Sequence, residues 1–284
     1  MKTLTLFICG LLLASGTPEA FNKHWYSGKA EVAVYDLQQS RYGILRPGTA
    51  TLIFVVEPFS KGKHVKLDNP SAEGKDKAMV LKLNTSKKYN TGIYPYSVMT
   101  SAFSDVESGQ LYKTTTSIQE WCGHVFSQAN VDKKGNYDYQ SFSYFESSGD
   151  QEMTFEGASL AEELILKIRL NKLDQDTKKM MIVPPQEALR NHHLPAKKVA
   201  AELNWSEGAK TRTLTVTYDL PNKLETTITY EKDFPYEIQN WTESFDQGGK
   251  RNTTSATLKT IQMIPYWSMN SPEFAGKRKE IGLE

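Results

Sequence analysis

Cysteine is scarce in this sequence, with Cys9 and Cys122 as its only two among 284 residues. Cys9 lies in an apolar N-terminal run that we expect to be removed from the mature protein. Cys122 would then have no partner within the chain. An intrachain disulfide is therefore excluded, and stability must come from packing.

Net charge and long apolar runs are also scarce. The formal net charge is +1, and no basic stripe is interleaved with aromatic residues. Nucleic acid binding, which depends on neutralising many phosphates, is therefore not predicted. Beyond the N-terminal run, no segment has the roughly 20 apolar residues of a transmembrane span. The hydrophobic content of 39% predicts a folded, soluble body.

The first 16 residues have the pattern of a signal peptide. A basic start is followed by the apolar residues 4–13 and by small residues at 14–16. We predict cleavage after residue 16, or as late as residue 20, and export to the periplasm or cell envelope. Cys9 is poorly placed for a lipoprotein signal, so a lipid anchor is the less favoured alternative.

Residues 22–284 are predicted to form a single β-rich domain. Runs that alternate apolar and polar residues are separated by turns rich in Gly, Pro and Asp. The predicted strands cover residues 29–37, 49–56, 78–83, 93–103, 178–183, 199–205, 211–218, 223–231, 236–245 and 253–264. Pro47 is placed in a turn and Pro58 at a strand end. This spacing predicts a large curved antiparallel sheet or half-barrel without alternating helices.

One or two short helices are expected beside the sheet. Ser159 and Glu162 match a capping box, and apolar residues at helical spacing follow over residues 160–170. The same residues also alternate, which leaves a strand as an open alternative. Residues 186–191 are predicted to form a helical turn.

Residues 118–146 are predicted to form a long β-hairpin, with two aromatic-rich runs around the polar residues 132–136. In a strand, side chains alternate between faces. Glu120, Cys122 and His124 should then point one way and Trp121 the other. This hairpin contains the strongest candidates for a chemical site.

Cys122 and His124 suggest a thiol nucleophile and its base, with Glu120 as a third candidate. A thiolate attacks only when a neighbour lowers the thiol pKa or removes its proton. Residues two apart on a strand are separated by about 6.6 Å, so the imidazole would have to lean along the strand. A small buried cysteine beside a hydrogen-bonded histidine is the favoured alternative.

Neither a metal nor a cofactor is predicted. On one strand, Glu120 and His124 would lie about 13 Å apart. Zinc ligands bind at roughly 2.0–2.3 Å, so a single ion would not reach both.

Aromatic side chains of the hairpin are candidates for a ligand surface. They are Trp121, Tyr137, Tyr139, Phe142 and Tyr144. Such a surface would suit an apolar or polysaccharide ligand. Core packing is the alternative and is favoured, because cross-strand pairs hold the register of a sheet. The oligomeric state is not indicated.

Several strings resemble a family of exported proteins of the Bacteroidetes group whose function is unknown. They are Arg41-Tyr42-Gly43, Leu81-Lys82-Leu83-Asn84, Tyr89-Asn90-Thr91-Gly92-Ile93-Tyr94-Pro95-Tyr96-Ser97, Gln119-Glu120-Trp121-Cys122-Gly123-His124 and Ser143-Tyr144-Phe145-Glu146. Residues 234–238 and 257–261 also loosely resemble half-barrel envelope proteins such as the lipoprotein carriers. That second resemblance implies a concave face able to hold an apolar chain.

Some members of the first family are labelled "septum formation inhibitor Maf". True Maf proteins are nucleotide pyrophosphatases that open with Leu-Ala-Ser-x-Ser-Pro-Arg-Arg. This chain has Leu-Ala-Ser-Gly-Thr-Pro at residues 13–18, and then Glu19 and Ala20 in place of both arginines. A carboxylate there would repel a triphosphate, so the label does not fit.

Together these patterns favour a non-enzymatic exported protein that binds a ligand on a curved β-sheet or serves a structural role. A thiol-dependent hydrolase or transferase using Cys122 and His124 is the alternative. A Maf-type pyrophosphatase is a remote one.

Overall fold

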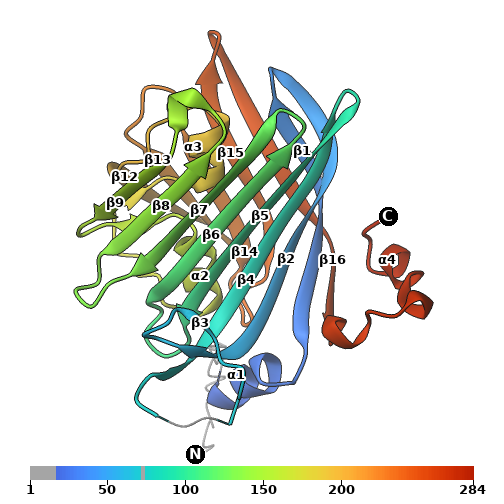
Figure 1. Ribbon diagram of the computed structural model, residues 1–284. Coiled ribbons are helices and arrows are strands. Elements are labelled where there is room, and N and C mark those ends of the chain that lie inside the picture. Colours follow the sequence, from blue (N-terminus) through green and yellow to red (C-terminus); the bar gives the residue numbers. More distant parts are fainter. Residues whose placement is uncertain (1–16, 72–73) are drawn as a thin grey trace, which may run out of the picture.

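The computed structural model describes residues 17–71 and 74–284 (Figure 1). The predicted signal peptide, residues 1–16, lies outside the described residues. The strands are β1 (Ala30–Arg41), β2 (Ile44–Ser60), β3 (Val65–Lys66), β4 (Lys77–Thr91), β5 (Tyr94–Asp105), β6 (Leu111–Glu120), β7 (Gly123–Val131), β8 (Tyr137–Ser143), β9 (Gln151–Phe155), β10 (Ser159–Leu160), β11 (Lys179–Val183), β12 (Val199–Glu207), β13 (Thr211–Tyr218), β14 (Glu225–Glu231), β15 (Ile238–Gln247) and β16 (Lys250–Ile264).

The strands form one curved sheet, which confirms the predicted fold class. Their order is β10-β11-β12-β13-β14-β15-β16-β1-β2-β4-β5-β6-β7-β8-β9, with β3 beside β2. The chain passes from β9 at one edge to β10 at the other through residues 156–158. Three residues span only about 10 Å, so the sheet curls until its two edges approach each other. The parallel pair β10 and β11 is the exception in an otherwise antiparallel sheet.

Short helices accompany the sheet, and among the described residues there are four α-helices where one or two were expected. They are α1 (Pro18–Trp25), α2 (Glu163–Arg169), α3 (Gln186–Asn191) and α4 (Lys277–Glu280). Short 3-10 helices cover Glu146–Ser148, Tyr266–Ser268 and Pro272–Phe274. Within the described part of the chain, no helix has the length and apolar character needed to cross a membrane.

Helices α2 and α3 lie on the concave side, between the β4–β8 and β12–β15 parts of the sheet (Figure 1). Leu164, Leu166 and Ile168 of α2 are all buried. A helix that is apolar on most sides belongs inside a core. The predicted helix is therefore confirmed, although it begins later than expected.

The predicted capping box is wrong. Residue Glu162 precedes α2 and makes no capping hydrogen bond with its side chain. Instead, its carboxylate accepts a hydrogen bond of 2.8 Å from the backbone N–H of Gln186, at the start of α3. This contact joins the beginnings of the two interior helices.

Prolines were expected to interrupt strands, and this expectation is wrong for β2. Pro47 and Pro58 both lie within β2, and Pro95 lies within β5. Pairing of β2 with β4 begins at Gly48, so Pro47 has a partner strand only on the β1 side. Pro58 likewise lies beyond the residues of β2 that pair with β1, and Pro95 lies before the residues of β5 that pair with β6. A missing N–H does no harm where a strand has one partner.

A buried ion pair joins the interior helix to the first strand near α1. Arg169 donates to both carboxylate oxygens of Glu31 at 2.6 Å, and His24 of α1 lies 2.9 Å from the same carboxylate. The Arg169 guanidinium also lies over the rings of Trp25 and Phe54, at 5.0 and 4.5 Å. This network fixes α1 across one end of the curled sheet.

Candidate ligand-binding interior

A row of small hydroxyl side chains crosses the concave face. Consecutive register pairs run from β4 to β8, and the row consists of Thr85, Thr100, Thr116, Ser127 and Ser141. At its two ends, Thr85 pairs in register with Leu52 of β2, and Ser141 pairs with Gln151 of β9. Side chains this short do not fill the space between the sheet and the interior helices. We call these five residues the hydroxyl row.

One end of the hydroxyl row borders a cavity of about 120 Å³, which we call the apolar cavity. Thr85 and Thr100 line it from β4 and β5. Apolar residues of β2, β4, β5, α2 and the far side of the sheet also line it: Leu52, Leu83, Ala102, Leu164, Ile165, Ile228 and Trp241. An engineered apolar cavity of roughly 150 Å³ binds benzene, so this space suits a ring or a short branched alkyl group.

Three polar atoms in the wall of the apolar cavity are buried without a hydrogen-bond partner. They are Oε2 of Glu162, the hydroxyl of Tyr218 and Oγ1 of Thr226. Burial raises the pKa of Glu162 to about 7. Burial also raises the pKa of Tyr218, a group that lies within electrostatic range of Glu162. The Tyr218 and Thr226 hydroxyls face each other in a weak contact that opposes the rise in the pKa of Tyr218, whereas Oε2 of Glu162 has no partner among the described residues. Buried polar atoms normally find partners, so Oε2 and the unused capacity of these hydroxyls are available to a bound molecule.

The apolar cavity also has buried ionic groups along one side. Lys87 of β4 forms an ion pair of 2.7 Å with Glu187 of α3, and His192 lies 3.5 Å from Glu243 of β15. Burial alone would lower the pKa of Lys87, but Glu187 and Glu243 outweigh it and raise that pKa. Burial alone would raise the pKa of Glu243, whereas His192 and Lys87 hold it below its ordinary value. These charges fasten α3 between two parts of the sheet.

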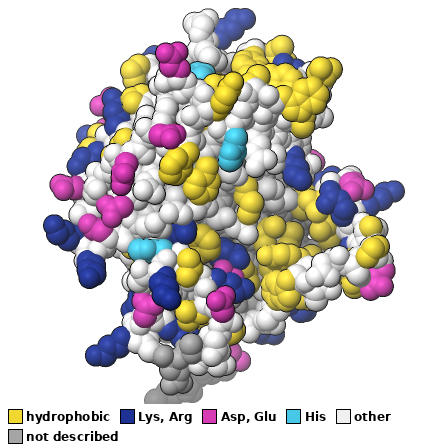
Figure 2. Space-filling model, in the orientation of Figure 1, with side chains coloured by type: hydrophobic (Ala, Val, Ile, Leu, Met, Phe, Trp, Pro, Cys, Tyr) yellow, Lys and Arg dark blue, Asp and Glu magenta, His cyan; other side chains and the backbone are white. Residues whose placement is uncertain are grey.

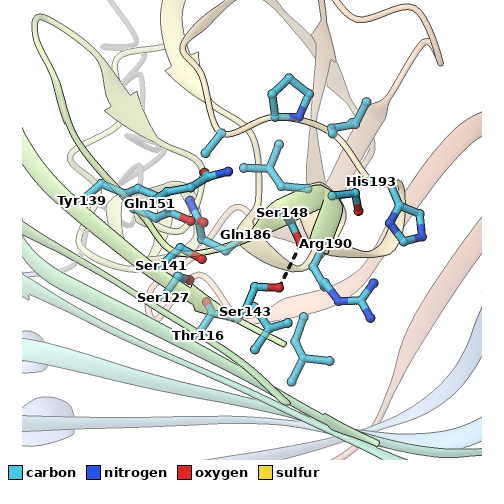
Figure 3. Close-up of a pocket in the computed structure, with 17 residues that line it drawn as sticks. Thr116, Ser127, Tyr139, Ser141, Ser143, Ser148, Gln151, Gln186, Arg190 and His193 are labelled. Atoms are coloured by element: carbon cyan, nitrogen blue, oxygen red, sulfur yellow. Dashed lines mark hydrogen bonds between the residues drawn. The ribbon is translucent and has the colours of Figure 1, made fainter. Parts of the chain in front are cut away.

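The other end of the hydroxyl row borders a second space of about 170 Å³, the polar pocket (Figure 3). Thr116, Ser127 and Ser141 point into it from the sheet, and Gln186 and Arg190 face them from α3. The start of α3 separates the two spaces, because Gln186 lines the polar pocket whereas Glu187 lines the apolar cavity. The hydroxyl row runs past this helix and borders both spaces.

The predicted thiol site has a different geometry. Trp121 and Cys122 form a two-residue turn between β6 and β7, so Glu120, Cys122 and His124 do not share one strand face. His124 pairs with Gln119 across the turn. Cys122 is exposed, which also contradicts the favoured buried-cysteine alternative. Within the described residues, no group of three or more His, Cys, Asp or Glu side chains is placed to hold a metal.

The thiol of Cys122 is not activated by its surroundings. A hydrogen bond with Glu120 and the negative charge of that residue raise the pKa of Cys122. A raised pKa leaves less thiolate at neutral pH, and the thiolate is the nucleophile. This arrangement gives no support to thiol-dependent catalysis.

We expect Cys122 to be labelled completely in the native protein, but slowly. Ellman's reagent at pH 7 should react without denaturant, because the thiol is exposed, and more slowly than with free cysteine. Glu120→Gln should raise the rate several-fold, because it removes the carboxylate that favours the protonated thiol over the reactive thiolate. A wild-type rate far above that of free cysteine would instead indicate an activated nucleophile.

The five aromatic ligand-surface candidates lie on two faces. Tyr137 and Tyr139 are buried on the concave side, and only Tyr139 lines the polar pocket. Trp121, Phe142 and Tyr144 are exposed on the outside. They do not form one aromatic groove. Tyr144 packs against Gly123, where a Cβ atom would lie 2.7 Å from its ring.

Exposed apolar side chains gather at the end of the molecule that carries these turns (Figure 2). Tyr42, Ile93 and Trp121 lie at the β1–β2, β4–β5 and β6–β7 turns, and all are more than half exposed. Tyr144 follows β8 at the same end. These residues surround the end of the curled sheet and do not line either interior space.

Sequence reasoning missed the interior polar residues, although one signal was present. Lys87 lies two residues from both Thr85 and Tyr89 along β4. Side chains two apart in a strand share a face, so Lys87 points inward with them and with Leu83. An inward lysine requires an acidic partner. No comparable signal identifies Glu162 or Arg190, because both lie beside or within short helices.

Comparison with known proteins gives little further information. No family model matches the chain, and no curated protein matches it. Among solved structures, the chain is similar to a β-barrel-like protein of a domain of unknown function, DUF1849, from Brucella abortus. The identity is 10% and the TM-score is 0.47, with 83% of this chain and 98% of that chain covered.

Proposed function

We propose that this chain is a non-enzymatic binding protein that holds an amphipathic ligand inside its curved sheet. The apolar end of the ligand would occupy the apolar cavity, and its polar end would extend along the hydroxyl row into the polar pocket. Export to the periplasm or cell envelope, predicted from residues 1–16, is part of the same proposal.

The unpartnered polar atoms of the apolar cavity are the observation that carries this proposal. A buried polar atom without a partner costs about 1–3 kcal/mol. Oε2 of Glu162 is such an atom, and the hydroxyls of Tyr218 and Thr226, which have only a weak contact with each other, line the same space. A ligand with an apolar body and a hydrogen-bonding group would satisfy these atoms while filling the space beside them.

Small hydroxyl side chains on the adjacent strands support an extended ligand. Thr100 and Thr116 share a hydrogen bond of 3.0 Å, and they border the apolar cavity and the polar pocket respectively. Hydroxyl groups both donate and accept, so they can satisfy many kinds of polar group. The arrangement therefore favours a molecule that is apolar at one end and polar at the other.

Filling the apolar cavity should weaken ligand binding strongly. We expect octanol to bind the wild-type chain in a calorimetric titration, and Thr100→Phe to weaken that binding about ten-fold or more, because the ring occupies the cavity. Met99→Phe is the matched control. It adds the same ring at the neighbouring, exposed position of β5 and should leave octanol binding unchanged.

Both variants should melt cooperatively and show wild-type circular dichroism, which establishes that they are folded. The proposal fails if octanol does not bind the wild-type chain, or if Thr100→Phe binds it as tightly as Met99→Phe does. Native mass spectrometry provides a second readout. A ligand retained during purification should be present on Met99→Phe and absent from Thr100→Phe.

A further inference from the structure

Arg190 in the polar pocket has a charge that its protein neighbours only partly neutralise. Its side chain is 8% exposed. Nε and Nη1 are buried without a hydrogen-bond partner. The nearest carboxylate oxygen, Oε1 of Glu120, lies 3.9 Å from Nη2, which is beyond hydrogen-bond distance. Each of the two hydrogen-bonding edges of this planar group, Nε–Nη2 and Nη1–Nη2, therefore has an unused donor.

The charges around Arg190 leave an excess of positive charge. Burial lowers the pKa of Arg190, and the like charge of Arg41 lowers it further. Burial and both arginines also lower the pKa of His193, which favours its neutral form. Glu120 is the one carboxylate among the described residues within 4 Å of the Arg190 guanidinium. Among the described residues, no carboxylate lies within 4 Å of the neighbouring Arg41 guanidinium, so Glu120 is the one carboxylate this close to either arginine.

The rest of the polar pocket supplies neutral hydrogen-bonding groups. Ser143 and Ser148 share a hydrogen bond of 2.9 Å, and both point toward the space in front of Arg190 (Figure 3). Ser147 and Gln186 also line this space. On its other side, the guanidinium lies over the Phe145 ring at 3.9 Å, which restricts its plane.

We propose that the polar pocket is an oxyanion subsite, in which Arg190 binds the phosphate or carboxylate head group of the amphipathic ligand. A guanidinium binds an oxyanion in bidentate fashion through its Nε–Nη2 edge or its Nη1–Nη2 edge, and in Arg190 each of these edges has an unused donor, Nε or Nη1, beside Nη2. Seryl hydroxyls can turn to donate to the remaining oxygens. This inference rests on the proposed function and adds the chemical class of the polar end.

Octyl phosphate, octanol and inorganic phosphate separate the contributions of the head group and the alkyl chain. We expect octyl phosphate to bind the wild-type chain at least ten-fold more tightly than octanol does, and inorganic phosphate to bind far more weakly than octyl phosphate. Arg190→Gln should weaken octyl phosphate binding roughly ten- to hundred-fold, as expected for charged hydrogen bonds. Octanol binding should not change.

Glu120→Gln should have the opposite effect. Removing the carboxylate that competes for Arg190 should tighten octyl phosphate binding several-fold. Because Arg190→Gln leaves Glu120 nearly buried without a cation, a Glu120→Gln/Arg190→Gln double variant should restore stability and still bind octyl phosphate weakly. Arg212→Gln is the control, since this arginine pairs with Glu207 on β12 and does not line the polar pocket.

Three results would overturn the inference. The first is equal binding of octyl phosphate and octanol, in which case the proposed function stands without an oxyanion head group. The second is unchanged octyl phosphate binding in the double variant. The third is inorganic phosphate binding as tightly as octyl phosphate, which would indicate a site for free phosphate.

Discussion

Glu31→Gln is expected to lower the free energy of unfolding by roughly 3–5 kcal/mol. The substitution leaves Arg169 with no anion at a position where its side chain is 0% exposed. A neutral amide accepts at most part of the bidentate hydrogen bonding that Glu31 provides. For a chain of this size, the loss corresponds to a decrease in melting temperature of roughly 6–20 °C, measurable by calorimetry.

The effect of Glu31→Gln should depend on pH in a defined direction. Burial alone would raise the pKa of Glu31, but Arg169 and His24 lower it to about 2. A carboxyl group with a lower pKa in the folded state binds fewer protons there than in the unfolded state. It therefore contributes stability above its unfolded pKa of about 4.5, and this contribution is lost as the pH falls toward 2. The difference in the free energy of unfolding between wild type and Glu31→Gln should therefore narrow as the pH falls from about 4.5 to 2.

A matched control lies on the same strand. Asp36 is exposed on β1 and lies 3.7 Å from Lys259. Asp36→Asn should change the free energy of unfolding by less than about 0.5 kcal/mol, because exposed pairs contribute little. Equal effects of the two substitutions on the free energy of unfolding would show that the buried Glu31–Arg169 pair does not stabilise the fold. Glu31→Leu combined with Arg169→Met should recover much of the loss, since an apolar replacement leaves no uncompensated charge.

The strands were predictable because their two faces meet different surroundings. In β12, Val199, Ala201 and Leu203 are buried while the residues between them are exposed. In the sequence, this contrast appears as alternating apolar and polar residues. The length of β2 was underestimated because proline was taken as an interruption, whereas Pro47 and Pro58 lie where β2 has one partner.

The turn at Trp121 and Cys122 could not be found from local composition. Two-residue turns are usually recognised by Asn-Gly or Asp-Gly, and this one has an exposed tryptophan and a cysteine. Without that signal, β6 and β7 read as one continuous strand. Because of this error, the residues predicted as the site lie at a surface turn, whereas the candidate site in the structure lies in the interior.

The interior site depends on contacts between distant segments. Lys87 meets Glu187, and Arg169 meets Glu31, only because the sheet curls around α2 and α3. Sequence alternation shows that a side chain points inward, but it does not show which partner it meets there. The hydroxyl row likewise exists only once the registers of β4 to β8 are known.

Lys87→Met is expected to lower the free energy of unfolding by about 3–5 kcal/mol at pH 7.5. Methionine keeps the length of the side chain but leaves Glu187 without its cation and removes one of the two groups that lower the pKa of Glu243. Denaturant titration measures the loss. Hydrogen exchange should also speed up at the amide of Leu189 in α3 and at that of His192, which caps the helix, because the helix loses its charged attachment to β4.

The loss caused by Lys87→Met should shrink as the pH falls. Lys87 helps to hold the pKa of Glu243 below its ordinary value. Without Lys87, burial raises the folded pKa of Glu243, so the folded variant takes up protons at a pH where the unfolded chain does not. The folded variant therefore gains relative stability toward acid pH.

Lys88→Met tests whether these effects come from the interior charge. Lys88 is the next residue of β4, is exposed on the outer face and should tolerate the same substitution within about 0.5 kcal/mol. If Lys87→Met were as mild as Lys88→Met, or if its effect grew toward acid pH, the buried charges would not be what fastens α3 between the apolar cavity and the polar pocket. A selective loss in Lys87→Met, greatest at pH 7.5, would show that they are.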